Sequence, residues 1–260
     1  MTGLLTPLLR KRTGARCTDP SEPVDPGRLR KPPHILRDSE DRGSSRSLFA
    51  EAVLKHVASF IAAGGNELVL FGINLGRWGR GFSATANTIN SSPRTLAELV
   101  RHILRRTSLA RLRLSSIEPM DWDGDLIGLM AEFGGFRLAR RAHLPLQSGS
   151  DAVLRRMHRR YRPWHYVEKV EALLRAAGPS LTLGADVMVG FPGETEGEFA
   201  ETLELVRALP FGYLHLFPFS PRPGTLGWHS TPSVRFRQRL WKSGWKYCAP
   251  WRLKRLRLIV

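Results

Sequence analysis

Five apolar segments of the sequence each end in small, hydrogen-bonding residues of the kind that can hold a ligand. These corners are Gly72-Ile73-Asn74, Ser115-Ser116-Ile117-Glu118-Pro119, Gln147-Ser148-Gly149-Ser150, Gly190-Phe191-Pro192-Gly193-Glu194 and Phe219-Ser220-Pro221-Arg222-Pro223. Glycine lets a ligand approach the backbone, and the neighbouring amide, hydroxyl and carboxyl groups can bind it. The pattern favours a site for a polar small molecule. Ordinary turns are the alternative, because they use the same residue types.

Three titratable residues lie within the apolar segments rather than at their ends. A buried carboxylate needs a partner, so Asp186 is either a ligand contact or an anchor of the core. We interpret His143 and His215 as core histidines satisfied by hydrogen bonds, and we predict no metal site. The sequence shows no Walker loop, no dinucleotide-binding fingerprint and no Ser-His-Asp set with a recognisable spacing.

A strongly basic run, "RRMHRRYR" at 155–162, follows the third corner. We interpret it as the solvated face of a helix, because charged runs on helices usually face water. The alternative role is to grip an RNA backbone through its phosphates.

Strand and helix patterns alternate through the middle of the chain. Strands are predicted at 66–76, 111–119, 141–150, 181–195 and 211–225, and helices at 47–65, 92–107, 123–135, 151–178 (broken at Pro163) and 196–209. This alternation predicts parallel strands joined by crossover helices. The fold class is therefore α/β, a partial (β/α) barrel whose first strand, expected before residue 47, is degraded or missing. Such barrels bind ligands at the carboxyl ends of their strands, where the five corners lie.

Composition narrows the class of protein further. The 260 residues are 42% hydrophobic, as in a globular protein, and no apolar run is long enough to span a membrane. The N-terminus lacks the residue order of a secretory signal. With only Cys17 and Cys248, we expect no disulfide framework and a cytoplasmic location. The net charge is +17, and residues 234–260 contribute nine Lys or Arg without an acid.

Six motifs in one order and spacing carry a family resemblance. They are "RGSSRS", "ELVLFGINLGRWG", "RLRLSSIEP", "HLPLQSGSDAVLRRMHRRY", "DVMVGFPGETEGEF" and "HLFPFSPRPGT". Over about residues 42–229 the chain resembles radical S-adenosylmethionine (SAM) enzymes of the tRNA methylthiotransferase family, and most of all the branch that acts on threonylcarbamoyladenosine. The resemblance implies a six-strand partial barrel of the TIM type, with tRNA as partner. It also implies an N-terminal domain with a second iron–sulfur cluster and a small RNA-binding domain, neither of which we expect in this chain.

The resemblance also implies where SAM lies. Gly72 and Asn74 would line its methionine end, Ser116 and Glu118 would lie near the ribose, and further contacts would come from Gln147, Ser148 and Asp186. The family holds a [4Fe–4S] cluster with three thiolates of a Cys-x-x-x-Cys-x-x-Cys motif just before the position of Arg42. Residues 20–41 contain no cysteine, and Cys17 alone cannot replace three thiolates. The cluster ligands are therefore missing, and we assign no catalytic residue.

We expect residues 1–46 and 230–260, which flank the barrel core at 47–229, to be irregular and translated out of frame. Read one base later, the codons of His34 to Asp41 permit Thr-Tyr-Cys-Ala-Ile-Pro, which matches part of the family's cysteine motif. Read two bases later, both Trp-Lys pairs of the tail encode Glu between apolar residues at helical spacing. We therefore discount the tail's charge as an RNA-binding arm. The nucleotide sequence of both segments tests this hypothesis.

Function follows from the resemblance, with two alternatives. The first expectation is methylthiolation of a modified adenosine beside the tRNA anticodon, by a chain that is inactive as written. One alternative is a cluster-free barrel that binds SAM or RNA without catalysis. The other is a different radical SAM enzyme, because one barrel supports many reactions. Sulfur donor and oligomeric state are not encoded in any motif.

Overall fold

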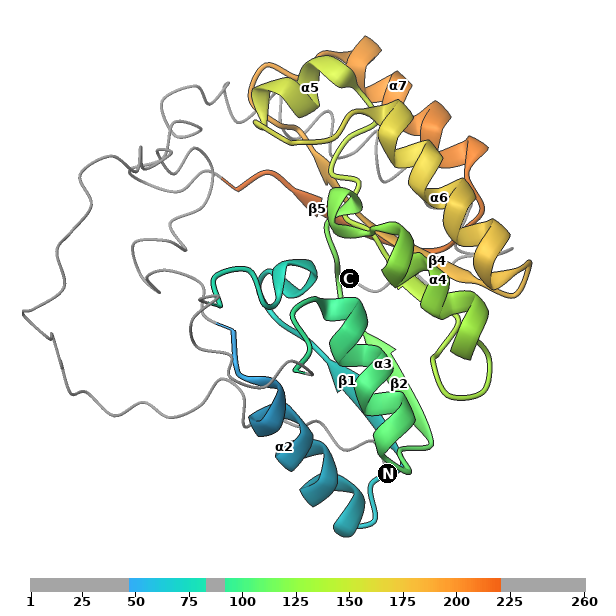
Figure 1. The fold of residues 1–260 in the computed structure, drawn as a ribbon. Coiled ribbons are helices and arrows are strands. Elements are labelled where there is room, and N and C mark those ends of the chain that lie inside the picture. The colour runs from blue at the N-terminus through green and yellow to red at the C-terminus, as the bar shows by residue number, and fades with distance from the viewer. Residues whose placement is uncertain (1–46, 83–91, 221–260) are drawn as a thin grey trace, which may run out of the picture.

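The computed structural model describes residues 47–82 and 92–220, which form a curved layer of strands with helices packed on one side (Figure 1). The expected segments 1–46 and 230–260, and the predicted corner residues after Ser220, lie outside the described residues.

The strands are all parallel and follow one another in space as they do in sequence. They are β1 (Glu67–Leu70), β2 (Arg111–Leu114), β3 (Arg141–His143), β4 (Thr182–Val189) and β5 (Phe211–Pro218). β1 pairs with β2, and β3, β4 and β5 form a second ladder in that order. A parallel bridge between Leu112 and Leu138 links the two ladders just before β3. The predicted α/β partial barrel is thus confirmed.

Helices connect the strands and cover their outer side. They are α2 (Ala50–Ala62), α3 (Leu96–Arg106), α4 (Gly124–Phe133), α5 (Asp151–Arg156), α6 (Pro163–Ala177) and α7 (Glu196–Ala208), with the short 3-10 helices η1 (Leu75–Arg77) and η3 (Pro119–Asp121). Alternate strand residues such as Leu112 and Leu114 are buried under this layer. No helix in the described part of the chain has both the length and the apolarity needed to cross a lipid bilayer.

Two helix boundaries show how local chemistry sets the elements. α3 begins at Leu96 rather than at the predicted Ser92, because Thr95 and Glu98 form a capping box that starts the helix there. The predicted break of the long basic segment is confirmed. Pro163 occupies the first turn of α6, where its missing N–H costs no hydrogen bond.

The interpretation of residues 155–162 as one solvated helix face is wrong. α5 ends at Arg156, and Arg156 and three arginines after it bind carboxylates of other segments of the chain. The ion pairs are Arg156–Glu198 at 2.7 Å, Arg159–Glu118 at 2.8 Å, Arg160–Asp121 at 3.1 Å and Arg162–Asp151 at 3.3 Å. The run therefore ties α5 to η3, to the second corner and to α7.

Candidate functional site

The carboxyl ends of β1 to β4 lie at one rim of the barrel, because the strands are parallel and adjacent. Four predicted corners therefore border a common region, which we call the carboxyl rim. Of the predicted site residues, Gly72, Asn74, Ser116, Glu118, Gln147 and Ser148 follow strand ends at this rim, whereas Asp186 lies within β4.

Gln147 has the geometry expected of a ligand contact. Its φ is 61°, which is unusual for a residue with a side chain, and Ser148 N donates to Leu146 O across it at 2.7 Å. The backbone is fixed further by bonds from Gln147 N to Asp186 O and from Met188 N to Gln147 O. The side-chain oxygen Oε1 is buried and has no hydrogen-bond partner among the described residues. A buried carbonyl oxygen without a donor is costly, so a bound ligand that donates to it would relieve that cost.

Ser148 is engaged within the protein instead. Its hydroxyl lies 3.0 Å from Thr202 Oγ1 of α7, and it accepts from Ser150 N at 3.1 Å. Gly149 N donates to the same Thr202 hydroxyl at 2.9 Å. The contact explains the glycine, because a Cβ at position 149 would lie 2.6 Å from Thr202 Cα. Sequence reasoning did not find Thr202, which resembles any polar residue of a helix until α7 is placed.

The first two corners are more open. Asn74 precedes η1, and its exposed side chain makes no capping bond to that helix. Gly72 is partly buried, and Ser116 is exposed. Glu118 has one carboxylate oxygen bound to Arg159, so its second oxygen is what it offers to a ligand. These residues border the rim in the order in which their strands are arranged.

Glu194 shapes the fourth corner. Its Oε2 accepts from Gly190 N at 2.6 Å and from Phe191 N at 3.2 Å, while Oε1 is buried and unpartnered in the described structure. Gly190 and Gly193 both have a φ of 75°, which lets the loop turn back onto its own carboxylate. Burial outweighs these two backbone bonds and raises the pKa of Glu194 to about 7. The corner therefore depends on a carboxyl group that is half protonated near neutral pH.

Asp186 bridges the two histidines. Its Oδ1 lies 3.0 Å from His143 Nε2 on β3 and 3.1 Å from His215 Nδ1 on β5. His143 Nδ1 in turn lies 2.8 Å from the Tyr213 hydroxyl, to which Arg141 donates from Nε and Nη2 at 3.0 and 2.7 Å. This arrangement fits the core-anchor interpretation of Asp186, and its contact with a ligand stays a prediction.

The same bonds bear on metal binding. The three potential ligand atoms of His143, Asp186 and His215 lie within 4.8 Å of one another, a spacing that a metal ion could use. However, Arg141 occupies the acceptor positions of the Tyr213 oxygen, so the tyrosine proton points to His143 Nδ1. His143 Nε2 then carries a proton and donates to Asp186. A metal would have to displace that proton, so the geometry favours a hydrogen-bonded trio.

The charge state of Asp186 follows from two opposing effects. Burial raises its pKa, but the hydrogen bonds and electrostatic attraction of His143 and His215 outweigh burial. The net pKa of Asp186 therefore lies below its ordinary value, and the group is a carboxylate at neutral pH.

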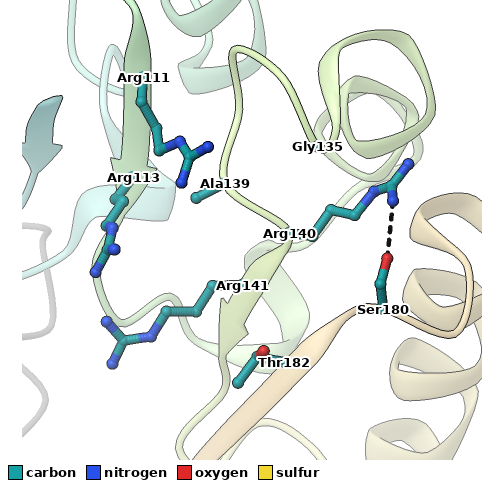
Figure 2. A pocket seen from close by; sticks show the side chains of 8 residues that line it. All are labelled: Arg111, Arg113, Gly135, Ala139, Arg140, Arg141, Ser180 and Thr182. Atoms are coloured by element: carbon teal, nitrogen blue, oxygen red, sulfur yellow. Dashed lines mark hydrogen bonds between the residues drawn. The ribbon is translucent and has the colours of Figure 1, made fainter. Parts of the chain in front are cut away.

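A second hollow lies at the opposite rim (Figure 2). It has a volume of about 390 Å³ and is lined by Arg111, Arg113, Gly135, Ala139, Arg140, Arg141, Ser180 and Thr182. Arg111, Arg141 and Thr182 are the first residues of β2, β3 and β4. We call this feature the amino-rim hollow; no candidate residue from the sequence lies in it.

Comparison with known proteins identifies the barrel. The family model described as the radical SAM superfamily matches residues 30–206. The chain belongs to the radical SAM superfamily. The matched region includes all described strands except β5.

Curated relatives of this radical SAM chain modify tRNA, as their names state. This chain is 40% identical over 184 residues to the tRNA-2-methylthio-N(6)-dimethylallyladenosine synthase of Parafrankia sp. (strain EAN1pec). The match covers 71% of this chain and 35% of the relative. The chain is 36% identical over 193 residues to the enzyme of the same name from Rickettsia bellii (strain RML369-C), covering 74% and 41%. The chain thus spans less than half the length of these relatives. Both names specify dimethylallyladenosine rather than threonylcarbamoyladenosine.

Two solved structures share the fold. SuiB from Streptococcus suis bound to S-adenosylmethionine aligns with a TM-score of 0.54 at 10% identity, over 84% of this chain and 45% of SuiB. Coproporphyrinogen III oxidase (HemN) from Escherichia coli aligns with a TM-score of 0.51 at 16% identity, over 77% of this chain and 46% of HemN.

The two cofactors implied by the superfamily fit this chain unequally. The unpartnered Gln147 oxygen and the exposed Asn74 and Ser116 suit a ligand such as SAM with many hydrogen-bonding groups. A [4Fe–4S] cluster that uses three thiolates does not fit, because the sequence holds only Cys17 and Cys248 and the described residues contain neither.

Proposed function

We propose that this chain is the barrel of a radical SAM tRNA methylthiotransferase that binds SAM at the carboxyl rim and is inactive as written. The observation that carries the proposal is the convergence of the corners at one rim, with the buried Gln147 oxygen free to accept from a ligand. The 40% identity to a methylthioadenosine synthase supports the reaction class. Gly72, Asn74, Ser116, Glu118 and Gln147 would surround SAM. Ser148 and Asp186 would position the corner and β4 beside it.

The target would be an N6-modified adenosine of tRNA, in the cytoplasm. The six motifs taken together favour threonylcarbamoyladenosine, as the resemblance implies. The names of the relatives favour dimethylallyladenosine as the second candidate. Methylthiolation of tRNA transcripts that carry one or the other modification distinguishes them, once the missing cysteines are supplied in a repaired chain.

A second function follows from the missing cysteines. Without thiolates for a cluster, the barrel would bind SAM, or RNA, without catalysis. In this case the carboxyl rim keeps its ligand but no radical is formed.

Anaerobic iron–sulfur reconstitution of the full chain, followed by titration with SAM, tests these proposals. We expect no stoichiometric iron uptake, and saturable SAM binding that weakens by about tenfold in Gln147→Ala. The matched control is Gln238→Ala, which removes the same side chain from the basic tail. Loading with four irons per chain would contradict the proposed inactivity. SAM binding that is absent, or equally tight in Gln147→Ala, would contradict the proposed site.

A further inference from the structure

The amino-rim hollow concentrates positive charge at the end of the barrel opposite the corners. Figure 2 shows Arg111 and Arg113 projecting from β2 and Arg141 extending toward the same side from β3, while Arg140 points to Ser180. None of the eight residues drawn along the hollow is acidic. The hollow is therefore lined by four positively charged guanidinium groups.

Protein partners neutralise only part of this charge. Arg113 forms an ion pair with Glu67 of β1. Arg141 donates to Tyr213, and Arg140 donates from Nη1 to Ser180 Oγ at 2.8 Å, so both are bound to neutral oxygens. The guanidinium of Arg111 has no partner within the residues that the structure describes. Four cations against one acid leave a formal excess of three positive charges around the hollow.

This excess of positive charge favours the binding of an anion. Like charges gathered around one hollow repel one another, and a bound anion relieves that repulsion. A cation would be repelled, and a neutral ligand would leave the charges unbalanced. Guanidinium groups bind planar or tetrahedral oxyanions with paired hydrogen bonds, and the Ser180 and Thr182 hydroxyls add donors at the same wall.

The size of the hollow favours a phosphate-bearing group over a bare ion. Its volume of about 390 Å³ lies within the range of roughly 300 to 1,000 Å³ that small-molecule sites occupy. A phosphoryl group carries one or two negative charges and several acceptor oxygens, so it can engage several arginines at once.

We propose that the amino-rim hollow is a phosphate-binding site, with Arg111 and Arg140 as its most available ligand groups. Two sources share this chemistry: the phosphodiester backbone of an RNA, and the phosphoryl group of a small molecule. The site is separate from the carboxyl rim and does not depend on SAM binding or on any cluster.

Isothermal titration of the full chain with inorganic pyrophosphate at low ionic strength tests the site. We expect saturable binding that weakens by about tenfold in Arg111→Gln and in Arg140→Gln. Arg111→Lys keeps the charge but loses the paired donors, so it should recover only part of the affinity. Lys55→Gln, at an exposed position of α2 away from the hollow, removes the same charge and should change the affinity by less than about twofold.

These measurements distinguish a specific phosphate site from general attraction by positive charge. Absence of saturable binding, or an equal loss in Lys55→Gln and Arg111→Gln, would overturn the site, because general charge would then explain the data. Fluorescence anisotropy with a single-stranded RNA identifies the source. Displacement of RNA by pyrophosphate, together with weaker RNA binding in Arg111→Gln, assigns the hollow to a phosphodiester. Weaker pyrophosphate binding with unchanged RNA binding assigns it to a small phosphorylated molecule.

Discussion

Burial keeps the carboxyl group of Glu194 protonated at pH values well above those at which a glutamic acid ordinarily ionises. Its usual pKa of 4.5 rises to about 7 in the fold, although two backbone N–H groups favour the charged form. The folded chain therefore binds more protons than the unfolded chain between pH 4.5 and 7. Protonation of Glu194 stabilises the fold fully below pH 4.5, and this contribution is lost as pH rises to about 7.

We expect Glu194→Gln to remove this part of the pH dependence, because glutamine keeps the acceptor oxygen but cannot ionise. The free energy of unfolding of the natural chain should fall by up to about 3 kcal/mol between pH 4.5 and 7, while that of the variant stays flatter. Urea unfolding at several pH values measures this difference. Glu196→Gln, at an exposed position of α7, is the matched control and should keep the natural slope. If the unfolding free energies of the natural chain and Glu194→Gln changed equally with pH, the raised pKa of Glu194 would be contradicted.

Asp186 shows the opposite behaviour. Its folded pKa lies below the ordinary 3.8, so its contribution to stability is present above that pH and is lost as pH falls through the folded value. Asp186→Asn should destabilise the chain at pH 7 by about 1 to 2 kcal/mol, because both histidines lose a charged acceptor. The loss should be smaller at pH 3. Chemical unfolding at the two pH values measures both. An equal loss at pH 3 and pH 7 would show that packing, rather than charge, explains the effect.

At the scale of elements, the contact between α7 and the third corner fixes Gln147. Thr202 binds both Ser148 and Gly149 N, and Gly149 allows the helix to approach the loop. Tyr161 reinforces this arrangement, because its hydroxyl shares its one proton between the carbonyl oxygens of Pro145 and Leu146, at 2.9 and 3.0 Å. The corner is therefore held from two sides before any ligand arrives.

Gly149→Ala tests this packing. The added Cβ would lie 2.6 Å from Thr202 Cα and 3.1 Å from Glu201 O, both backbone atoms that cannot move independently. We expect a destabilisation of about 1 to 3 kcal/mol and weaker SAM binding. Gly128→Ala is the matched control, because position 128 lies in α4 with nothing within 4 Å of the new Cβ. It should stabilise the chain by up to about 1 kcal/mol. Thermal unfolding measures the melting temperature of both variants. That temperature should fall in Gly149→Ala and rise in Gly128→Ala, and a fall or a rise in both would contradict the packing argument.

The sequence predicted these elements well because their signals are local. Strand alternation, the capping residues and Pro163 act over a few neighbouring residues. Side-chain partners could not be predicted in the same way. Ser148 meets Thr202 across 54 positions, and Arg159 meets Glu118 across 41. Only the folded arrangement shows that Ser148 faces a helix and that the basic run binds acids.

For the molecule as a whole, the two sides of the strand layer differ in chemistry. Leu112 and Leu114 point to the helices, whereas Arg111 and Arg113 alternate with them on the other side. The Asp186 trio continues this polar side across β3 to β5. The sequence signalled the apolar side most clearly in β1 and β2, where buried residues alternate along the strand. It did not signal the amino-rim hollow, whose four arginines come from two separate segments, at 111–113 and 140–141.

The polar side has a consequence for how such a barrel can change. Most of the buried apolar surface lies between strands and helices, and the hydrogen bonds of the Asp186 trio on the polar side add a smaller share of the stability. A substitution on the polar side that leaves this apolar contact intact can therefore change the chemistry of the site while the surrounding architecture persists.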